Sequence, residues 1–211
     1  MNYHHIKTGN TSLHIFFAGW GMDEHPFTHL ANDKEDLLIC YDYTDLSFDK
    51  SLLNGYRHIR LTAWSMGVWA AAKVLGNTDT NIEYALAVNG THTPVNDTTG
   101  IPHSIFHATL DTLSEQSLAK FNRRMCGNKD TLDFYNRNAS KRSIESLRNE
   151  LKAIGEACSS ETPVLKWNKV IAGERDLIFP YKNQIAAWGQ SVDILSVNEA
   201  HFFDFKILNL A

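Results

Sequence analysis

The feature that most constrains the fold is a short apolar run, 59–63, that meets a single serine, Ser65, followed by an alanine-rich helical segment over 68–75. A serine at a sharp strand-to-helix turn is a nucleophile elbow, which presents the hydroxyl at the end of a parallel strand. Small residues two positions to either side, here Ala63 and Gly67, suit such a turn because other backbone passes close to it. The usual elbow has glycine at both positions. The alternative is a buried serine at an ordinary strand–helix junction.

Six apolar runs, separated by polar or helical stretches, predict the strands of one sheet. Most of these runs are almost continuously apolar, which is typical of parallel strands covered on both faces. The predicted strands cover 13–18, 37–41, 59–63, 84–88, 169–172 and 192–197. Helical spacing occurs at 68–75, 180–188 and 202–210, and 26–34 indicates a short helix or a loop. The alternation predicts an α/β fold with a mostly parallel sheet of about six strands flanked by helices.

One long interval, 92–162, breaks this alternation. It is polar, it contains apolar residues at helical spacing and it offers no convincing strand. It stands between the predicted strands at 84–88 and 169–172, where a helical cap would be inserted. We therefore expect a single domain over 1–211 that carries a small helical cap insertion at about 92–162.

The composition narrows the class of protein. With 43% apolar residues the chain can bury a sizeable core, and a net charge of −4 argues against nucleic acid as a partner. The first residues lack an apolar signal segment, His4 and His5 are expected to be solvated, and no apolar run approaches the roughly 20 residues that span a membrane. The three cysteines fit neither a disulfide framework nor a metal pattern; they are Cys40, Cys126 and Cys158. We expect a cytoplasmic monomer that contacts no membrane.

Two further residues complete a possible catalytic triad. A serine hydroxyl becomes nucleophilic when an imidazole accepts its proton, and the imidazole needs a carboxylate to fix its tautomer. Asp176 and His201 each directly follow a predicted strand, where such groups reach the same edge of a parallel sheet. The order Ser65, Asp176, His201 is that of α/β-hydrolases. Glu174 remains an alternative acid and His92 an alternative base.

Acyl transfer also needs N–H donors for the developing oxyanion. The backbone N–H of Met66, immediately after the serine, is one expected donor. The other should come from the loop after the first predicted strand, where glycines on both sides of Trp20 let the backbone turn inward. The Trp20 N–H is therefore the second expected donor. The Trp20 ring either lines the acyl pocket or belongs to the core.

The predicted insertion is basic. From Lys120 to Lys152 there are nine Lys or Arg and four Asp or Glu, which leaves a charge of about −9 for the rest of the chain. Charged helix faces are often only solvated. A basic insertion over a negative body nevertheless suits an anionic partner or substrate tail.

Several motifs resemble those of the BioG family, the pimeloyl-[acyl-carrier protein] methyl ester esterases of biotin synthesis. The resemblance covers nearly the whole chain, through Phe-Ala-Gly-Trp-Gly-Met (17–22), Tyr-Asp-Tyr (41–43), Ala-Trp-Ser-Met-Gly (63–67), Val-Asn-Gly-Thr (88–91) and Gly-Glu-Arg-Asp-Leu-Ile-Phe-Pro (173–180). It implies an α/β-hydrolase fold with a serine esterase site.

By position, the resemblance makes Ser65 the nucleophile, His201 the base and Asp176 the orienting acid, with Trp20 and Met66 at the oxyanion positions. It also implies an acyl-carrier protein as partner, with no metal and no cofactor. Its candidate carrier contacts in the insertion are Arg123, Arg124, Arg137 and Arg142. Two other functions remain open: a general carboxylesterase or thioesterase with the same triad, and a non-catalytic binding protein of the same fold.

Overall fold

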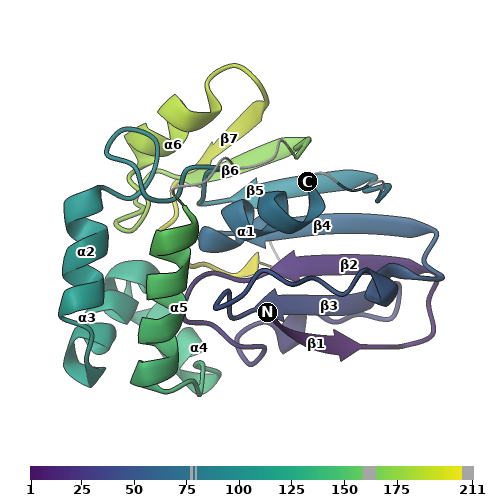
Figure 1. Cartoon of the computed structure of the whole chain (residues 1–211), viewed down its shortest axis with the longest axis horizontal. Helices are drawn as coiled ribbons and strands as arrows, with labels where there is room; N and C mark the ends of the chain where they lie inside the picture. Colours follow the sequence, from purple (N-terminus) through teal and green to yellow (C-terminus); the bar gives the residue numbers. More distant parts are fainter. Residues whose placement is uncertain (77, 79, 159–164, 206–211) are drawn as a thin grey trace.

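The computed structural model describes residues 1–76, 78, 80–158 and 165–205. It contains a seven-stranded sheet in the order β1-β3-β2-β4-β5-β6-β7, in which β1 is antiparallel to β3 and all other neighbours are parallel (Figure 1). The strands are β1 (Asn2–Ile6), β2 (Ser12–Phe17), β3 (Asp36–Tyr41), β4 (His58–Trp64), β5 (Tyr84–Val88), β6 (Lys169–Gly173) and β7 (Asp193–Val197).

The six predicted strands are confirmed, and the structure adds a seventh. The strand that was missed is β1, which pairs from Asn2 with Tyr41 to Ile6 with Leu37. His4 and His5, expected in a solvated terminus, are part of this strand and half-buried. An edge strand lies on the rim of the sheet and needs no continuous apolar run, so its sequence lacks the signal that revealed the buried strands.

Two helices outside the insertion follow the prediction closely. The elbow leads into α1 (Met66–Leu75), which packs on β4 and β2, and α6 (Tyr181–Trp188) begins after Pro180 and packs on β6. The interval 26–34 contains one short 3₁₀ helix, η1 (Thr28–Leu30), and a second one, η2 (Lys50–Leu53), precedes β4. The closing helix predicted over 202–210 falls mostly outside the described residues, and 202–204 are irregular.

Four helices occupy the interval of the predicted insertion. They are α2 (His103–Asp111), α3 (Glu115–Cys126), α4 (Lys129–Arg137) and α5 (Ile144–Ala157). Side chains of Ser114, Asn128 and Ser143 accept backbone N–H groups at the starts of α3, α4 and α5, which explains where those helices begin. Figure 1 shows all four gathered beyond the carboxyl ends of β2 and β4. The expected boundary at 162 lies outside the described residues.

An aromatic cluster supports the elbow strand from inside the core. Trp64, at the end of β4, lies with its ring centroid 5.6 Å from Phe202 and 5.5 Å from Phe205. Phe27 and Phe16 extend the cluster, with centroids 4.6 Å apart. Such pairs stabilise a core beyond their buried area. The strand that carries the serine is therefore embedded in densely packed rings on the side of residues 202–205.

A buried polar cluster lies nearer the amino ends of β2 and β4. His14 Nδ1 accepts a hydrogen bond from Arg60 at 2.8 Å, so the proton of the neutral ring is on Nε2, which lies 2.9 Å from Thr62 Oγ1. Arg60 in turn pairs with Glu35. Burial, with the Arg60 charge beside the ring, lowers the pKa of His14 to about 3. His14 is therefore neutral in the folded protein near pH 7.

The three cysteines are free. Among the described helices, none combines the length and the apolar character that crossing a membrane requires.

Candidate active site

Ser65 occupies the sharp turn predicted between β4 and α1. Its backbone has φ 62° and ψ −129°, a conformation that a residue with a side chain adopts only under constraint. The constraint includes a hydrogen bond from Ser65 N–H to the Val88 carbonyl at 2.9 Å. Gly67 is required because a Cβ there would lie 2.4 Å from the Phe17 carbonyl oxygen. The strain and the close approach agree with a nucleophile elbow.

Ser65, His201 and Asp176 form one chain of hydrogen-bonding distances. His201 Nε2 lies 2.9 Å from Ser65 Oγ, and His201 Nδ1 lies 2.8 Å from Asp176 Oδ2. Because the carboxylate can only accept, it places the imidazole proton on Nδ1 and leaves Nε2 free to accept the serine proton. All three residues are buried. The structure brings together the three residues that the sequence order singled out.

The loop after β6 fixes the carboxylate of Asp176. Its Oδ1 accepts the backbone N–H groups of Ile178 at 2.7 Å and Phe179 at 2.9 Å, and its Oδ2 accepts Gln184 Nε2 at 3.0 Å. With His201, four donors converge on this carboxylate, which leaves the side chain a single orientation. Gln184 comes from α6 and was not anticipated, since an amide eight residues after the acid carries no sequence signal of its own.

The alternative acid and base lie elsewhere. Glu174 is exposed to solvent, whereas Asp176 is buried. His92 packs edge-on against Trp188, with ring centroids 4.6 Å apart, and against Trp167 at 6.2 Å. Burial lowers the pKa of His92. These contacts make His92 a packing residue between aromatic rings.

Asn89, at the end of β5, joins the loops that carry the acid and the base. Its Nδ2 donates to the carbonyls of Ala200 at 3.0 Å and His201 at 2.9 Å, and its Oδ1 accepts the Gly173 N–H at 2.7 Å. The His201 carbonyl also accepts Trp64 Nε1 at 2.8 Å. Asn89 is fully buried and has φ 45°. The motif at 88–91 contained this asparagine, but the sequence did not reveal that it spans two loops.

The two expected oxyanion donors lie on either side of Ser65. Met66 is the first residue of α1, so its N–H has no partner within the helix. The backbone N–H of Trp20 has no backbone acceptor among the described residues. A Cβ on Gly19 would lie 3.1 Å from Ser65 Cβ, so the loop of Trp20 leaves β2 directly against the serine. Both residues line the same pocket as Ser65, as the donors of an oxyanion hole should.

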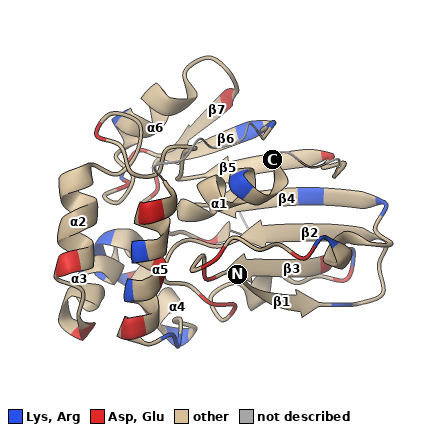
Figure 2. Cartoon of the chain, viewed as in Figure 1, with Lys and Arg blue, Asp and Glu red and all other residues tan. Residues whose placement is uncertain are grey.

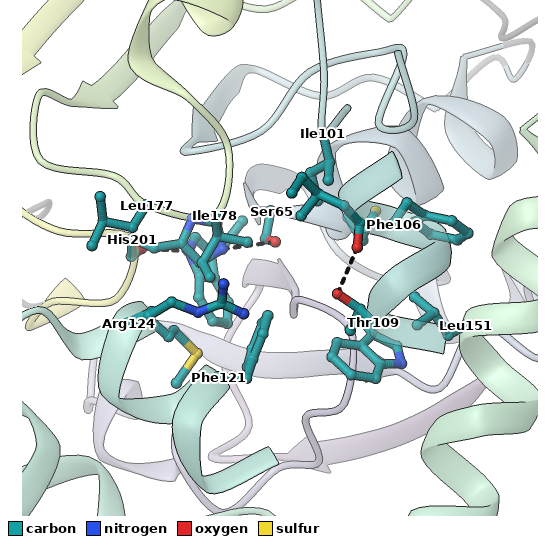
Figure 3. A pocket seen from close by; sticks show the side chains of 15 residues that line it. Ser65, Ile101, Phe106, Thr109, Phe121, Arg124, Leu151, Leu177, Ile178 and His201 are labelled. Atoms are coloured by element: carbon teal, nitrogen blue, oxygen red, sulfur yellow. Dashed lines mark hydrogen bonds between the residues drawn. The ribbon is translucent and has the colours of Figure 1, made fainter. Parts of the chain in front are cut away.

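That pocket is mainly apolar and opens to solvent between the insertion and the loop after β6. The empty space in the pocket, including open solvent at its mouth, is about 540 Å³. Ser65 and His201 face its interior, and Phe121, Phe106 and Ile101 approach from the insertion side (Figure 3). The Trp20 ring also lines it and packs against Phe121 with centroids 5.3 Å apart. Trp20 thus has both roles that the sequence left open.

Two large apolar side chains stay exposed at this pocket. Ile105 is 48% exposed and Leu177 is 64% exposed, and both line the site. Arg124 lines it as well, reaching in from α3 (Figure 3). Exposed apolar residues beside a polar rim commonly mark a binding surface.

The four predicted carrier contacts divide into two groups. Arg123, Arg124 and Arg137 are exposed on α3 and α4, where Figure 2 shows basic residues interspersed with acidic ones. Arg142 is only 9% exposed, and its guanidinium is 2.7 Å from Glu150 and 3.0 Å from Asp42. Because its charge is paired with these two carboxylates, Arg142 is not among the carrier contacts that we propose. The sequence suggested an exposed charge because the spacing of Arg142 gives no hint of its buried partners.

One cluster in the described residues has side chains that could hold a metal ion. Ligand atoms of Asp23, Glu24 and His25 lie within 4.8 Å of one another. Both Asp23 oxygens already accept backbone N–H groups, from His25 at 3.0 Å and Lys141 at 2.8 Å. These bonds explain the cluster as a junction between the loop after β2 and the insertion.

Comparison with known proteins identifies the family. The family described as Pimeloyl-ACP methyl esterase BioG matches residues 1–209. The chain belongs to the BioG family. The crystal structure of BioG from Haemophilus influenzae superimposes with a TM-score of 0.88 at 36% identity, covering 96% of this chain and 94% of that one. This BioG family member is thus related to that protein over nearly the full length of both.

Two other relatives place the BioG fold more broadly. The chain is 46% identical over 200 residues to a malonyl-[acyl-carrier protein] O-methyltransferase from Bacteroides fragilis; the match covers 93% of this chain and 41% of that protein. This chain therefore spans about two-fifths of the length of that relative. An esterase from Exiguobacterium antarcticum has a TM-score of 0.72 at 14% identity, covering 99% and 91% of the two chains, which shows the shared α/β-hydrolase fold. The class of reaction comes from the family, whose description is that of a methyl esterase, a carboxylic ester hydrolase.

Proposed function

We propose that this protein hydrolyses the methyl ester of pimeloyl-acyl-carrier protein, a step of biotin synthesis, by means of a serine triad. The observation that carries the proposal is the chain of contacts from Ser65 through His201 to Asp176 at an apolar pocket. Membership of the BioG family supports the choice of substrate.

In the first half of the reaction Ser65 Oγ attacks the distal ester carbonyl while His201 Nε2 takes its proton. The carbonyl electrons move to an oxyanion that the Trp20 and Met66 N–H groups stabilise. When the intermediate collapses, the C–O bond to the methoxy group breaks and His201 returns the proton, so methanol leaves.

In the second half His201 Nε2 takes a proton from a water molecule, whose oxygen attacks the carbonyl carbon of the acyl-serine ester. The same oxyanion positions stabilise the second intermediate, and its collapse restores Ser65 and releases the free carboxylate. Ester and water are converted to carboxylate, methanol and one proton. Asp176 holds the imidazole and its Nδ1 proton throughout.

The pocket suits an acyl chain that enters with its distal methyl ester first, while its other end stays attached to the carrier. An apolar enclosure with Ser65 inside suits a methylene chain that ends in a neutral methyl ester, and the charged carboxylate product is less suited to it. The carrier would then remain at the mouth, beside Ile105 and Leu177, with Arg124 as a nearby cation. This orientation keeps the thioester away from Ser65. The exposed basic residues Arg123 and Arg137 complement an acidic carrier protein.

The three free cysteines agree with the reducing cytoplasm, where we propose that the protein acts as a monomer.

The test is to incubate the purified protein with methyl-pimeloyl carrier protein and to weigh the carrier by mass spectrometry. A decrease in mass that corresponds to CH₂, as the methyl ester becomes the free acid on an intact acyl chain, supports the proposal. Release of the whole acyl group would make the protein a thioesterase. Ser65→Ala should fold normally and lose turnover by ~10⁶-fold, as nucleophile loss does in a comparable triad. Failure of a fluorophosphonate to label Ser65 in the wild type would leave a non-catalytic binding protein.

A further inference from the structure

The loop that carries the Trp20 N–H is held from the insertion rather than from the sheet. Its Trp20 indole donates to the Leu147 carbonyl at 2.9 Å, and its Gly21 N–H donates to Glu150 Oε2 at 3.1 Å. Both acceptors belong to α5, more than 120 residues along the chain. Gly21 itself has φ 79°, a conformation that favours glycine. The position of this loop therefore depends on α5.

Glu150 is the centre of these contacts. It is fully buried, with Oε2 accepting from Gly21 and from Arg142 Nη1 at 2.7 Å, and Oε1 accepting the Tyr43 N–H at 3.0 Å. Every one of its contacts needs an acceptor, so the carboxylate form fits the site and an amide does not. Burial raises the pKa of the Glu150 carboxyl, and the adjacent Arg142 charge opposes that effect.

Arg142 adds the second link. Its Nη1 donates to the Met22 carbonyl at 3.2 Å, at the far end of the same loop, and its Nη2 pairs with Asp42 after β3. Ser146 holds the guanidinium in place, 3.2 Å from Nε and 2.9 Å from Nη2. Glu150 therefore binds the Gly21 N–H, a donor of the loop, and Arg142 binds the Met22 carbonyl, an acceptor of the same loop.

We infer that Glu150 and Arg142 are positioning residues for the oxyanion hole, which hold the Trp20 N–H toward the reacting carbonyl at Ser65. The inference rests on the proposed acyl transfer. An oxyanion donor is effective only at about 2.7–3.1 Å from the developing charge, so a small shift of the 19–22 loop weakens it. The insertion thereby supplies part of the catalytic framework in addition to the pocket wall.

The experiment compares Glu150→Gln with Arg148→Met. The glutamine keeps the size of Glu150 but turns one acceptor into a donor, which opposes either the Tyr43 N–H or the Gly21 N–H. Arg148 lies on the same helix, and its acceptors within the described part of the chain are the Leu110 and Leu113 carbonyls, so its loss controls for general weakening of the insertion. Competent sites are counted by fluorophosphonate titration. The readouts are kcat and KM for a p-nitrophenyl ester, and the Ki of a trifluoromethyl ketone whose serine adduct bears an oxyanion.

We expect Glu150→Gln to lower kcat per titrated site ~10–10²-fold and to raise the Ki by a similar factor. This effect is smaller than the ~10²–10³-fold loss that removal of a whole donor causes, because the donor is displaced and not removed. KM should change little, and Arg148→Met should leave both values within about twofold. Arg142→Lys, which keeps the charge beside Glu150 but loses the fork geometry, should show a smaller rise in Ki.

A merely structural role would lower the number of titrated sites and leave the Ki per site unchanged; that result overturns the inference. An equal rise in Ki for Arg148→Met overturns it too. Should Glu150→Gln yield no folded protein, an unchanged Ki in Arg142→Lys decides against it. If the wild type is not labelled at Ser65, the proposed function itself fails, which is a separate result.

Discussion

Replacing Asn89 tests whether the alignment of acid and base depends on a residue that touches neither reacting atom. Asn89→Gly removes the side chain while tolerating the φ of 45°. Asn89→Ala removes the same atoms and adds strain. Asn89→Asp keeps an oxygen for the Gly173 N–H but turns the donor toward Ala200 and His201 into a second carboxylate oxygen.

The magnitudes follow from the contacts. Three buried hydrogen bonds at roughly 1 kcal/mol each predict that Asn89→Gly lowers the free energy of unfolding by about 3 kcal/mol. Alanine at positive φ should cost about 1 kcal/mol more. Asn89→Asp should lower the free energy of unfolding most, because it places a buried negative charge against the carbonyl oxygens of Ala200 and His201. The Trp64 bond to the His201 carbonyl remains, so kcat should fall ~10–10²-fold rather than vanish.

Stability is measured by urea unfolding, and kcat for a p-nitrophenyl ester is normalised to sites titrated by a fluorophosphonate. The expected order of kcat is wild type, then Gly, then Ala, then Asp. An Asn89→Asp protein with wild-type kcat per site would refute the reasoning, since the base would then keep its position with carboxylate and carbonyl oxygens opposed. A loss of stability without any loss of kcat in all three variants would reduce Asn89 to a core residue.

Two further predictions concern charges away from the reacting atoms. Arg123→Glu should lower kcat/KM for methyl-pimeloyl carrier protein by ~10-fold and change hydrolysis of a small ester by less than about twofold, because Arg123 is exposed on α3, next in sequence to the pocket-lining Arg124. Equal losses on both substrates would contradict a carrier contact. His14 binds a proton in the unfolded chain below pH ~6.5 but in the folded protein only near pH 3. The free energy of unfolding therefore decreases as the pH is lowered through that window. Between pH 7 and pH 5 this group alone should account for about 2 kcal/mol of lost stability, and urea unfolding of His14→Asn should show a pH dependence weaker by that amount. An identical pH dependence in wild type and variant would show that folding does not lower the pKa of His14.

The sequence predicted the sheet well because its buried strands are continuous apolar runs. The convergence of Ser65, Asp176 and His201 was also predictable, since each follows such a run and parallel strands end at the same edge. The edge strand β1 was missed because a strand on the rim needs no apolar run. Asn89 and Glu150 were not predictable in their roles, because their backbone partners lie more than 80 residues away and no local pattern records them. The sequence also suggested that Arg142 is exposed, because its contacts with Met22 and Asp42 come from distant parts of the chain.

The insertion contacts two loops of the candidate site directly. On one side, α5 holds the loop of Trp20, the proposed oxyanion donor, through Glu150. On another side, the Met125 carbonyl, near the end of α3, accepts the Phe202 N–H at 2.9 Å, next to His201, the proposed base. A Cβ on Gly127 would lie 2.6 Å from Ala200 Cβ, so α3 ends in close contact with the loop of His201. Two of the catalytic loops are thus fixed by the insertion. A rigid-body opening of all four helices would break the oxyanion loop contacts and the base loop contacts together, so substrate entry is better served by the exposed side chains of Ile105 and Leu177 at the mouth.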